Sequence, residues 1–327
     1  MDKRKKLYNV SLLRMFSTIL IIAFHILLSL SPGQGKQFFP FYMGVPIFLF
    51  ISGYLYASKE ITNVKNFYKS GILKILLPTT VFVLLYMIIL GIIALSNGVS
   101  IFGLTYDVSG GGVSLNSLGN LWFIPAIILC YLLLPLLNKL YNKELNGWQT
   151  ALCLLLFILA ELGCNALCTC AVLPFSIGFF AQKLKQKYPN KRLLAILLSI
   201  VAFCFLATAY PFVFKIAASN TNAPYLLEIA REFIVALIGV SFSIIFLFSL
   251  ENIKLPAWAE KFLRYFDHLS FPIYFVHHVV IFGALSLMRT TKIVSVDVMI
   301  VFVVTLAFSA LFDLMMKYIW KIFKNKE

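Results

Sequence analysis

Two ionisable residues stand inside the first long apolar stretch of the chain, residues 7–31. Arg14 and His25 are eleven positions apart, which places them about 20° apart around an α-helix and roughly 16 Å apart along it. A histidine can act as a general base near neutral pH, and an arginine stays charged and can bind phosphate. Ionisable groups at this depth in a membrane normally face protein or water. The pair therefore predicts a functional site inside a helical bundle.

A structural explanation of the same pair is also open. Arg14 can extend to the lipid headgroups, and His25 can hydrogen-bond to a neighbouring helix. Both explanations require other helices around residues 7–31. The rest of the chain is accordingly expected to form a membrane bundle built around this helix.

A second group of polar residues lies in the last third of the chain. Ser270, Tyr274 and His277 stand at positions i, i+4 and i+7, so they form one stripe along a helix. His277 and His278 are adjacent and point to different sides, and we expect at most one of them to belong to a common site. We also expect Pro272 in the first turn of this helix, where proline is tolerated.

One acid, Asp313, is expected to be buried in the last apolar segment. Arg14, His277 and Lys317 are its candidate partners, and a simple ion pair is the default explanation of a buried acid in a membrane.

The composition is that of an integral membrane protein. Of the 327 residues, 61% are hydrophobic and only 13% are charged, about half the usual charged fraction of a soluble domain; the mean hydropathy is +0.92. The net charge of +15 does not indicate nucleic-acid binding, because the lysines and arginines lie in short clusters between apolar runs. We expect one transmembrane domain over residues 1–327.

The fold class expected is all-α, a polytopic bundle of about ten transmembrane helices. The apolar segments are 7–31, 41–57, 75–96, 120–138, 148–163, 171–183, 193–213, 226–250, 269–288 and 295–318. With the N-terminus in the cytoplasm and strict alternation, inner segments carry 22 Lys and Arg and outer segments carry 5. This bias follows the positive-inside rule and places both termini in the cytoplasm.

Three loops carry weaker signals. Residues 97–119 form a Gly- and Ser-rich outer loop, either a lid or a connector. Residues 58–74 are basic, and contact lipid headgroups or a phosphate-bearing ligand. Cys164, Cys168 and Cys170 cluster without a fourth ligand, so we expect no metal site. We expect free cysteines, and a disulfide is the alternative if this loop faces an oxidising compartment.

Five motifs, taken in order, resemble those of the membrane-bound acyltransferase-3 family. They are Arg14-x10-His25, Val45–Tyr54 (VPIFLFISGY), Lys74–Pro78 (KILLP), Leu121–Ile124 (LWFI) and Ser270-x3-Tyr274-x2-His277. Two departures concern donor recognition: Lys74 replaces the usual arginine, and Gly71 stands where a further arginine is often found. The extracytoplasmic esterase-like domain that some members carry is not present in the sequence, so a second transfer step would need a separate partner in the cell envelope.

The resemblance implies an integral membrane O-acyltransferase of the bacterial cytoplasmic membrane. Such enzymes usually move an acetyl group from acetyl-CoA, a co-substrate and not a bound cofactor, to a hydroxyl of a surface polysaccharide or another extracytoplasmic glycan. The implied partners are the acyl-CoA donor, a glycan or lipid-linked sugar acceptor and the lipid bilayer, with no nucleic acid.

The resemblance and the residue chemistry together assign roles to particular side chains. His25 is the candidate general base, and Arg14 the candidate residue that orients the donor. Lys69 and Lys74 are candidate donor-binding residues. The supporting residues are Ser52, Tyr54, Trp122, Ser270, Tyr274 and His277.

Two other functions stay open. An exporter or flippase of a glycan or lipid-linked intermediate also fits buried polar residues under a Gly-rich outer loop. A transporter usually carries paired broken helices in its two halves, whereas only segment 171–183 looks interrupted here. A sensor or scaffold predicts that Arg14 and His25 can be replaced without effect.

Overall fold

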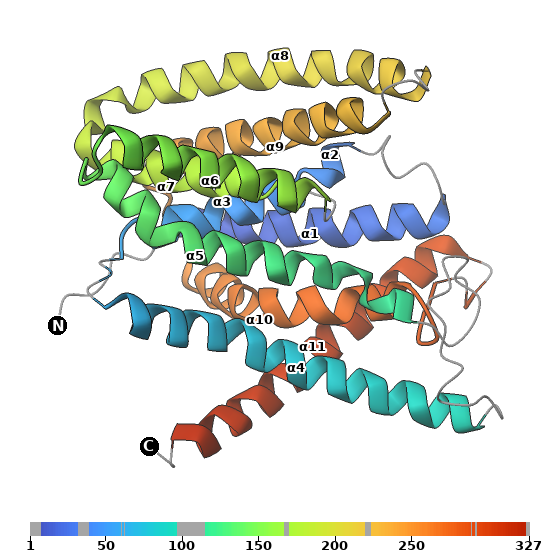
Figure 1. Ribbon diagram of the computed structural model, residues 1–327. Helices are drawn as coiled ribbons and strands as arrows, with labels where there is room; N and C mark the ends of the chain where they lie inside the picture. The colour runs from blue at the N-terminus through green and yellow to red at the C-terminus, as the bar shows by residue number, and fades with distance from the viewer. Residues whose placement is uncertain are drawn as a thin grey trace. The chain divides into compact units, whose positions relative to one another are not determined.

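The computed structural model describes residues 8–31, 39–59, 61, 63–96, 115–166, 170–219, 224–288, 290–291 and 293–324 (Figure 1). These residues form helices and connecting turns, and no β-strand occurs among them. Most of the Gly-rich loop, and Cys168, lie outside the described residues. The α-helices are α1 (Tyr8–Leu30), α2 (Phe39–Tyr42), α3 (Gly44–Tyr56), α4 (Val64–Ser96), α5 (Phe123–Tyr141), α6 (Gly147–Ala166), α7 (Val172–Lys187), α8 (Arg192–Ser219), α9 (Pro224–Ser249), α10 (Ala257–Ile281) and α11 (Val294–Lys324), and the 3₁₀ helices are η3 (Leu115–Trp122) and η4 (Pro189–Lys191).

The all-α membrane fold expected from the sequence is confirmed. Each of the ten apolar segments overlaps a helix. Among the described residues, seven helices are long and apolar enough to cross a membrane, namely those over Tyr8–Leu30, Val64–Ser96, Leu118–Tyr141, Gly147–Cys164, Pro189–Ile216, Leu227–Ser249 and Val294–Ile322. The number of spans and the orientation of the termini stay predictions.

Two helices begin more than ten residues before the apolar segments that predicted them. α4 starts at Val64, so most of the basic segment 58–74 is helical and not a loop. α10 starts at Ala257, which places Pro272 deep inside the helix and not in its first turn. For α10, the physical reason is that Leu263 and Phe266 are buried at helical spacing before the apolar run begins. Amphipathic packing therefore extends α10 toward its N-terminus.

Residue contacts divide the chain into two compact units. The first consists of residues 1–21, 39–69 and 124–264, and the second of residues 22–38, 70–123 and 265–327. Because α1 contributes to both, Arg14 belongs to the first unit and His25 to the second.

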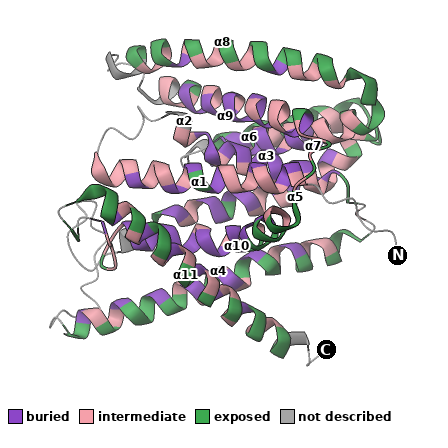
Figure 2. Ribbon diagram, turned by 180° about the vertical axis from the view of Figure 1, so that it is seen from behind, coloured by how far each residue is buried: buried purple, intermediate pink, exposed green. Residues whose placement is uncertain are grey.

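The first unit is built on a close contact between α3 and α7. A Cβ atom added to Gly53 of α3 would overlap the carbonyl oxygen of Phe175, and one added to Gly178 of α7 would overlap that of Phe50. Small residues allow membrane helices to approach to backbone contact. α9 packs on both helices, and α8 packs on α9 with most of its surface exposed (Figure 2).

The second unit positions α10 through aromatic packing. Phe275 of α10 lies 5.1 Å from Phe82 of α4 and 5.9 Å from Phe312 of α11, measured between ring centroids. Aromatic pairs at these separations add to the free energy of burial. This contact fixes the rotation of α10, and with it the direction of the histidines in the next turn.

Candidate active site

Three histidines of the second unit meet at one point. The ring of His25 on α1 lies 5.0 Å from the ring of His277 and 5.0 Å from the ring of His278, both on α10. The expectation that at most one of the two adjacent histidines would join a site is therefore wrong. Adjacent side chains diverge by about 100° around a helix, but a ring placed between the two directions contacts both.

The three rings differ in their access to the surroundings. His25 is partly exposed, whereas the exposed fraction is 1% for His277 and 8% for His278. Phe24 and Phe282 border the cluster, with Phe282 lying 4.7 Å from the ring of His278. His25 is thus the histidine that a reactant can reach, and the other two stand behind it.

The hydrogen bond of His277 defines its reactive nitrogen. Its Nδ1 lies 2.9 Å from the carbonyl oxygen of Ile273. A carbonyl only accepts hydrogen bonds, so Nδ1 carries the proton and Nε2 carries the lone pair in the neutral ring. This Nε2 is buried and has no hydrogen-bond partner among the described residues. His277 therefore offers a lone pair beside His25.

A short 3₁₀ segment, η3, is tied to α10 next to the histidines. The side-chain Nδ2 of Asn120 donates to the backbone carbonyl oxygen of Tyr274 at 2.6 Å, and the Tyr274 hydroxyl donates back to the backbone carbonyl oxygen of Asn120. A Cβ on the neighbouring Gly119 would lie 3.4 Å from the ring of His278. The two reciprocal bonds hold η3 against the cluster.

Asn120 and His278 were not among the site residues predicted from the sequence. Asn120 lies directly before the LWFI motif, which was the available signal. Trp122 reaches Tyr274 through an aromatic chain, with ring separations of 6.0 Å to Phe123 and 5.4 Å from Phe123 to Tyr274. Trp122 thus belongs to the packing around Tyr274.

The hydroxyls of Ser270 and Ser52 both bond within their own helices. Ser270 Oγ donates to the Asp267 carbonyl oxygen at 2.8 Å, and Ser52 Oγ donates to the Phe48 carbonyl oxygen at 3.1 Å. Ser270 is buried, as the helical stripe predicted.

Arg14 lies in the first unit beside two tyrosines. Its charge acts on the hydroxyl of Tyr131, which hydrogen-bonds to Tyr56; the two rings are 4.6 Å apart. The surroundings of Arg14 are therefore aromatic and polar.

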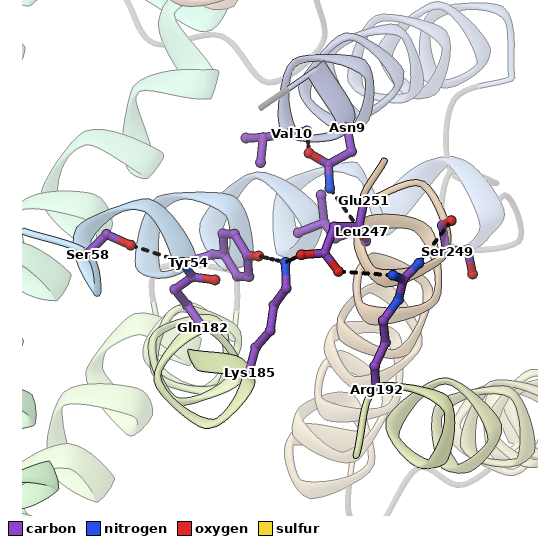
Figure 3. Close-up of polar contacts among 10 residues, drawn as sticks. All are labelled: Asn9, Val10, Tyr54, Ser58, Gln182, Lys185, Arg192, Leu247, Ser249 and Glu251. Carbon is purple, nitrogen blue, oxygen red and sulfur yellow. Dashed lines mark hydrogen bonds and ion pairs between the residues drawn. The ribbon is translucent and has the colours of Figure 1, made fainter. Parts of the chain in front are cut away.

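Tyr54 takes part in a polar network that Figure 3 shows. Lys185 of α7 donates to the Tyr54 hydroxyl at 3.1 Å and pairs with Glu251 at 2.7 Å, and Arg192 pairs with the same carboxylate at 3.1 Å. Burial by itself lowers the pKa of Lys185, but its bonds to Glu251 and Tyr54 outweigh burial, and the pKa is raised. The network joins α3, α7, α8 and the end of α9.

The first unit also contains a cavity of about 570 Å³ at the ends of α3, α5 and α7. Three lysines line it, Lys59, Lys139 and Lys183, together with one carboxylate, Glu144, so the charge of the lining is positive on balance. Its volume suits a small molecule, and its lysines favour an anionic one. Two other lysines, which the sequence suggested for donor binding, occupy a different position: Lys69 and Lys74 are exposed on α4 and do not line this cavity.

Asp313 is partly and not fully buried, and it forms the simple ion pair that the sequence predicted. It lies 2.7 Å from Lys317, one of its three candidate partners, and 2.9 Å from Nε2 of His268, which the sequence did not suggest. Within the described part of the chain, no group of histidine, cysteine and acidic side chains is arranged to hold a metal ion.

A comparison with known families agrees with these motifs. A family model described as an acyltransferase domain, of the acyltransferase-3 type, matches residues 7–314, nearly the whole chain. The chain belongs to the membrane acyltransferase-3 family. No curated protein and no solved structure matched it. The protein is thus a multi-pass membrane acyltransferase.

The acyltransferase motifs divide between the two units. The histidine of the first motif and the S-x3-Y-x2-H motif meet in the second unit around His25. The VPIFLFISGY motif shapes the first unit, because Gly53 allows α7 to approach and Pro46 packs against Gly239 of α9. In this acyltransferase, one motif therefore supplies ionisable groups and another supplies close helix packing.

Proposed function

We propose that this acyltransferase moves a short acyl group, acetyl in the first instance, from acyl-CoA to a hydroxyl of a cell-surface polysaccharide or another extracytoplasmic glycan. The observation that carries the proposal is the partly exposed ring of His25, backed by the buried lone pair of His277 Nε2. Membership of the family supports the reaction class.

The chemistry needs a base at the acceptor. His25 takes the proton of the sugar hydroxyl while the hydroxyl oxygen attacks the thioester carbonyl. The carbon–sulfur bond then breaks, and the proton passes to the leaving thiolate, which yields the ester and free CoA. The lone pair of His277 Nε2 is available to hold a proton next to His25 during the transfer.

The donor is proposed to enter from the lysine-rich ends of the helices. Arg14 stays charged in poorly hydrated surroundings and would orient the thioester or phosphates of the donor. The cavity lined by Lys59, Lys139 and Lys183 suits the phosphates of CoA by volume and charge. Lys69 and Lys74, exposed on α4, would attract the same anion before it binds.

The orientation of the chain forms part of the proposal. The bias of 22 Lys and Arg in the inner segments to 5 in the outer ones supports cytoplasmic termini, in a bacterial cytoplasmic membrane. Acyl-CoA then meets the lysine-lined cavity from the cytoplasm. A glycan or lipid-linked sugar approaches from the other side, with a separate cell-envelope partner for any second transfer.

Release of free thiol from acetyl-CoA tests the reaction. The full chain is purified in nanodiscs with a surface-glycan extract as acceptor, and His25→Ala is compared with His268→Ala. His268 is a matched control, since it is a histidine of the second unit that pairs with Asp313 away from the cluster. We expect acceptor-dependent release that falls about 100- to 10,000-fold in His25→Ala and persists in the control.

Two outcomes contradict the proposal. Unchanged thiol release in His25→Ala would exclude His25 as the general base. No release with any acyl-CoA, while the glycan still reaches the cell surface in cells carrying His25→Ala, moves the exporter to first place.

The proposed donor cavity has its own test. Lys59→Gln and Lys183→Gln are expected to raise KM for acetyl-CoA by about fivefold to tenfold each with little change in kcat, because they remove charge that binds the donor and its transition state alike. Lys254→Gln, an exposed lysine outside the cavity, is the matched control. Equal KM values in all three variants would exclude this cavity as the donor site.

A further inference from the structure

A second concave surface in the first unit has a different character from the lysine-lined cavity. It is a groove of about 470 Å³ between the ends of α7, α8 and α9. Its walls are apolar and include Ile177 and Leu184 of α7, Leu194 and Leu198 of α8, and Ile244 of α9. Leu194 and Leu198 remain 52% and 61% exposed. In a membrane, such walls are covered by hydrocarbon chains.

The mouth of the groove is cationic. Lys185, Lys191 and Arg192 line it, and Glu251 is the carboxylate that pairs with two of them, Lys185 at 2.7 Å and Arg192 at 3.1 Å (Figure 3). Lys191 lies 5.1 Å above the ring of Tyr188. Glu251 is thus shared by Lys185 and Arg192, and Lys191 adds a third positive charge. The mouth therefore carries more positive than negative charge.

The backbone at the mouth adds to this charge. α8 begins at Arg192, directly after the 3₁₀ turn η4. The N-terminal end of a helix carries a partial positive charge that favours an anion nearby. An anionic group at this mouth therefore meets side-chain cations and the positive end of a 28-residue helix.

We propose that the groove binds an anionic phospholipid of the surrounding membrane. One acyl chain lies along the apolar walls between α7 and α8, and the phosphodiester sits at the mouth beside Lys191 and Arg192. Charge complementarity selects a headgroup that carries net negative charge, such as phosphatidylglycerol, over a zwitterionic one. On the orientation proposed above, the lipid comes from the cytoplasmic leaflet.

The apolar walls distinguish this groove from the donor cavity. A free phosphate compound would gain from the three cations at the mouth but nothing from Ile177, Leu198 or Ile244. The groove also needs no acyl transfer to be occupied. Lipid binding can therefore be measured independently of the proposed activity.

Native mass spectrometry of the full chain in detergent tests the proposal. The protein is titrated with phosphatidylglycerol and with phosphatidylcholine of the same chain length, and apparent Kd values are compared for wild type and the Lys191→Gln/Arg192→Gln variant. We expect wild type to prefer phosphatidylglycerol. In the variant, the ratio of the Kd for phosphatidylcholine to the Kd for phosphatidylglycerol should fall by about fivefold for each cation removed. The Lys261→Gln/Lys321→Gln variant has the same charge change on exposed residues elsewhere and should bind like wild type.

Ala195→Phe tests the apolar part without changing charge. Ala195 lines the groove on α8, and a phenyl ring there should occupy the space of the acyl chain and weaken phosphatidylglycerol binding at least fivefold. Equal binding of the two lipids to wild type would overturn the proposal. So would glycerol phosphate that binds as tightly as the lipid, or phosphatidylglycerol binding that Ala195→Phe leaves unchanged.

Discussion

The ring of His277 lies 5.0 Å from the ring of His25, and its Nδ1 is held by the carbonyl oxygen of Ile273, one turn earlier in α10. The backbone of α10 thereby sets the tautomer of a side chain that borders a residue of α1. A hydrogen bond of this kind orients the imidazole and determines which nitrogen carries the lone pair. The contact brings together the histidine of the first motif and the histidine of the last one.

His277→Asn distinguishes the role of Nδ1 from that of Nε2. The asparagine amide can still donate to the Ile273 carbonyl oxygen, but it lacks the lone pair of Nε2. We expect kcat for thiol release to fall about 100-fold or more, with the unfolding temperature close to that of wild type. Wild-type kcat in this variant would contradict a role for Nε2 in the reaction.

Asn120 and Tyr274 provide a graded test of how η3 is held. Tyr274→Phe removes the hydroxyl bond to Asn120, with an expected cost of about 1 kcal/mol. Asn120→Ala removes the donor to the Tyr274 carbonyl oxygen and should cost about 1–3 kcal/mol, since that buried acceptor loses its side-chain donor. Thermal unfolding in detergent measures both. A larger effect for Tyr274→Phe than for Asn120→Ala would contradict this ranking.

Gly53→Ala tests the contact of α3 with α7. The added Cβ would overlap the Phe175 backbone, so one of the helices must move, and we expect a loss of about 1–3 kcal/mol of stability. Gly163→Ala on α6 is the matched control, because no heavy atom lies within 4 Å of its added Cβ. The control should unfold at the wild-type temperature or slightly above it. Equal melting curves for both variants would show that α3 and α7 are not in contact.

Glu251→Gln gives a stability difference that depends on pH. Although burial lowers the pKa of Lys185, its bonds to Glu251 and Tyr54 raise it above its ordinary 10.5. The protonated lysine therefore stabilises the fold at pH values below 10.5, and the contribution disappears as the pH rises through the folded-state pKa. We expect Glu251→Gln to cost about 1 kcal/mol at neutral pH.

The same comparison is then repeated above pH 10.5. The difference between wild type and Glu251→Gln should shrink there, but not vanish, because Arg192 keeps its charge beside Glu251. A difference that grows with pH would contradict the assignment of the raised pKa to Lys185.

The sequence by itself determined the helical membrane fold and singled out the candidate reacting groups. Long apolar runs must form helices in lipid, because their backbone groups find no other hydrogen-bond partners there. Arg14 and His25 stood out because ionisable side chains inside such runs are costly. The order of five short motifs indicated the family before any contact was known.

Only the tertiary structure decided which groups meet. Helical periodicity gives the direction of a side chain around its own axis, but not the neighbour that stands there. His278 was set aside for its direction, yet its ring lies 5.0 Å from that of His25. Tyr54 was predicted only as a supporting residue, and the structure shows that its hydroxyl receives a hydrogen bond from Lys185. Both outcomes depend on packing between helices far apart in the sequence, where aromatic contacts and glycines set the distance and rotation that local patterns leave undetermined.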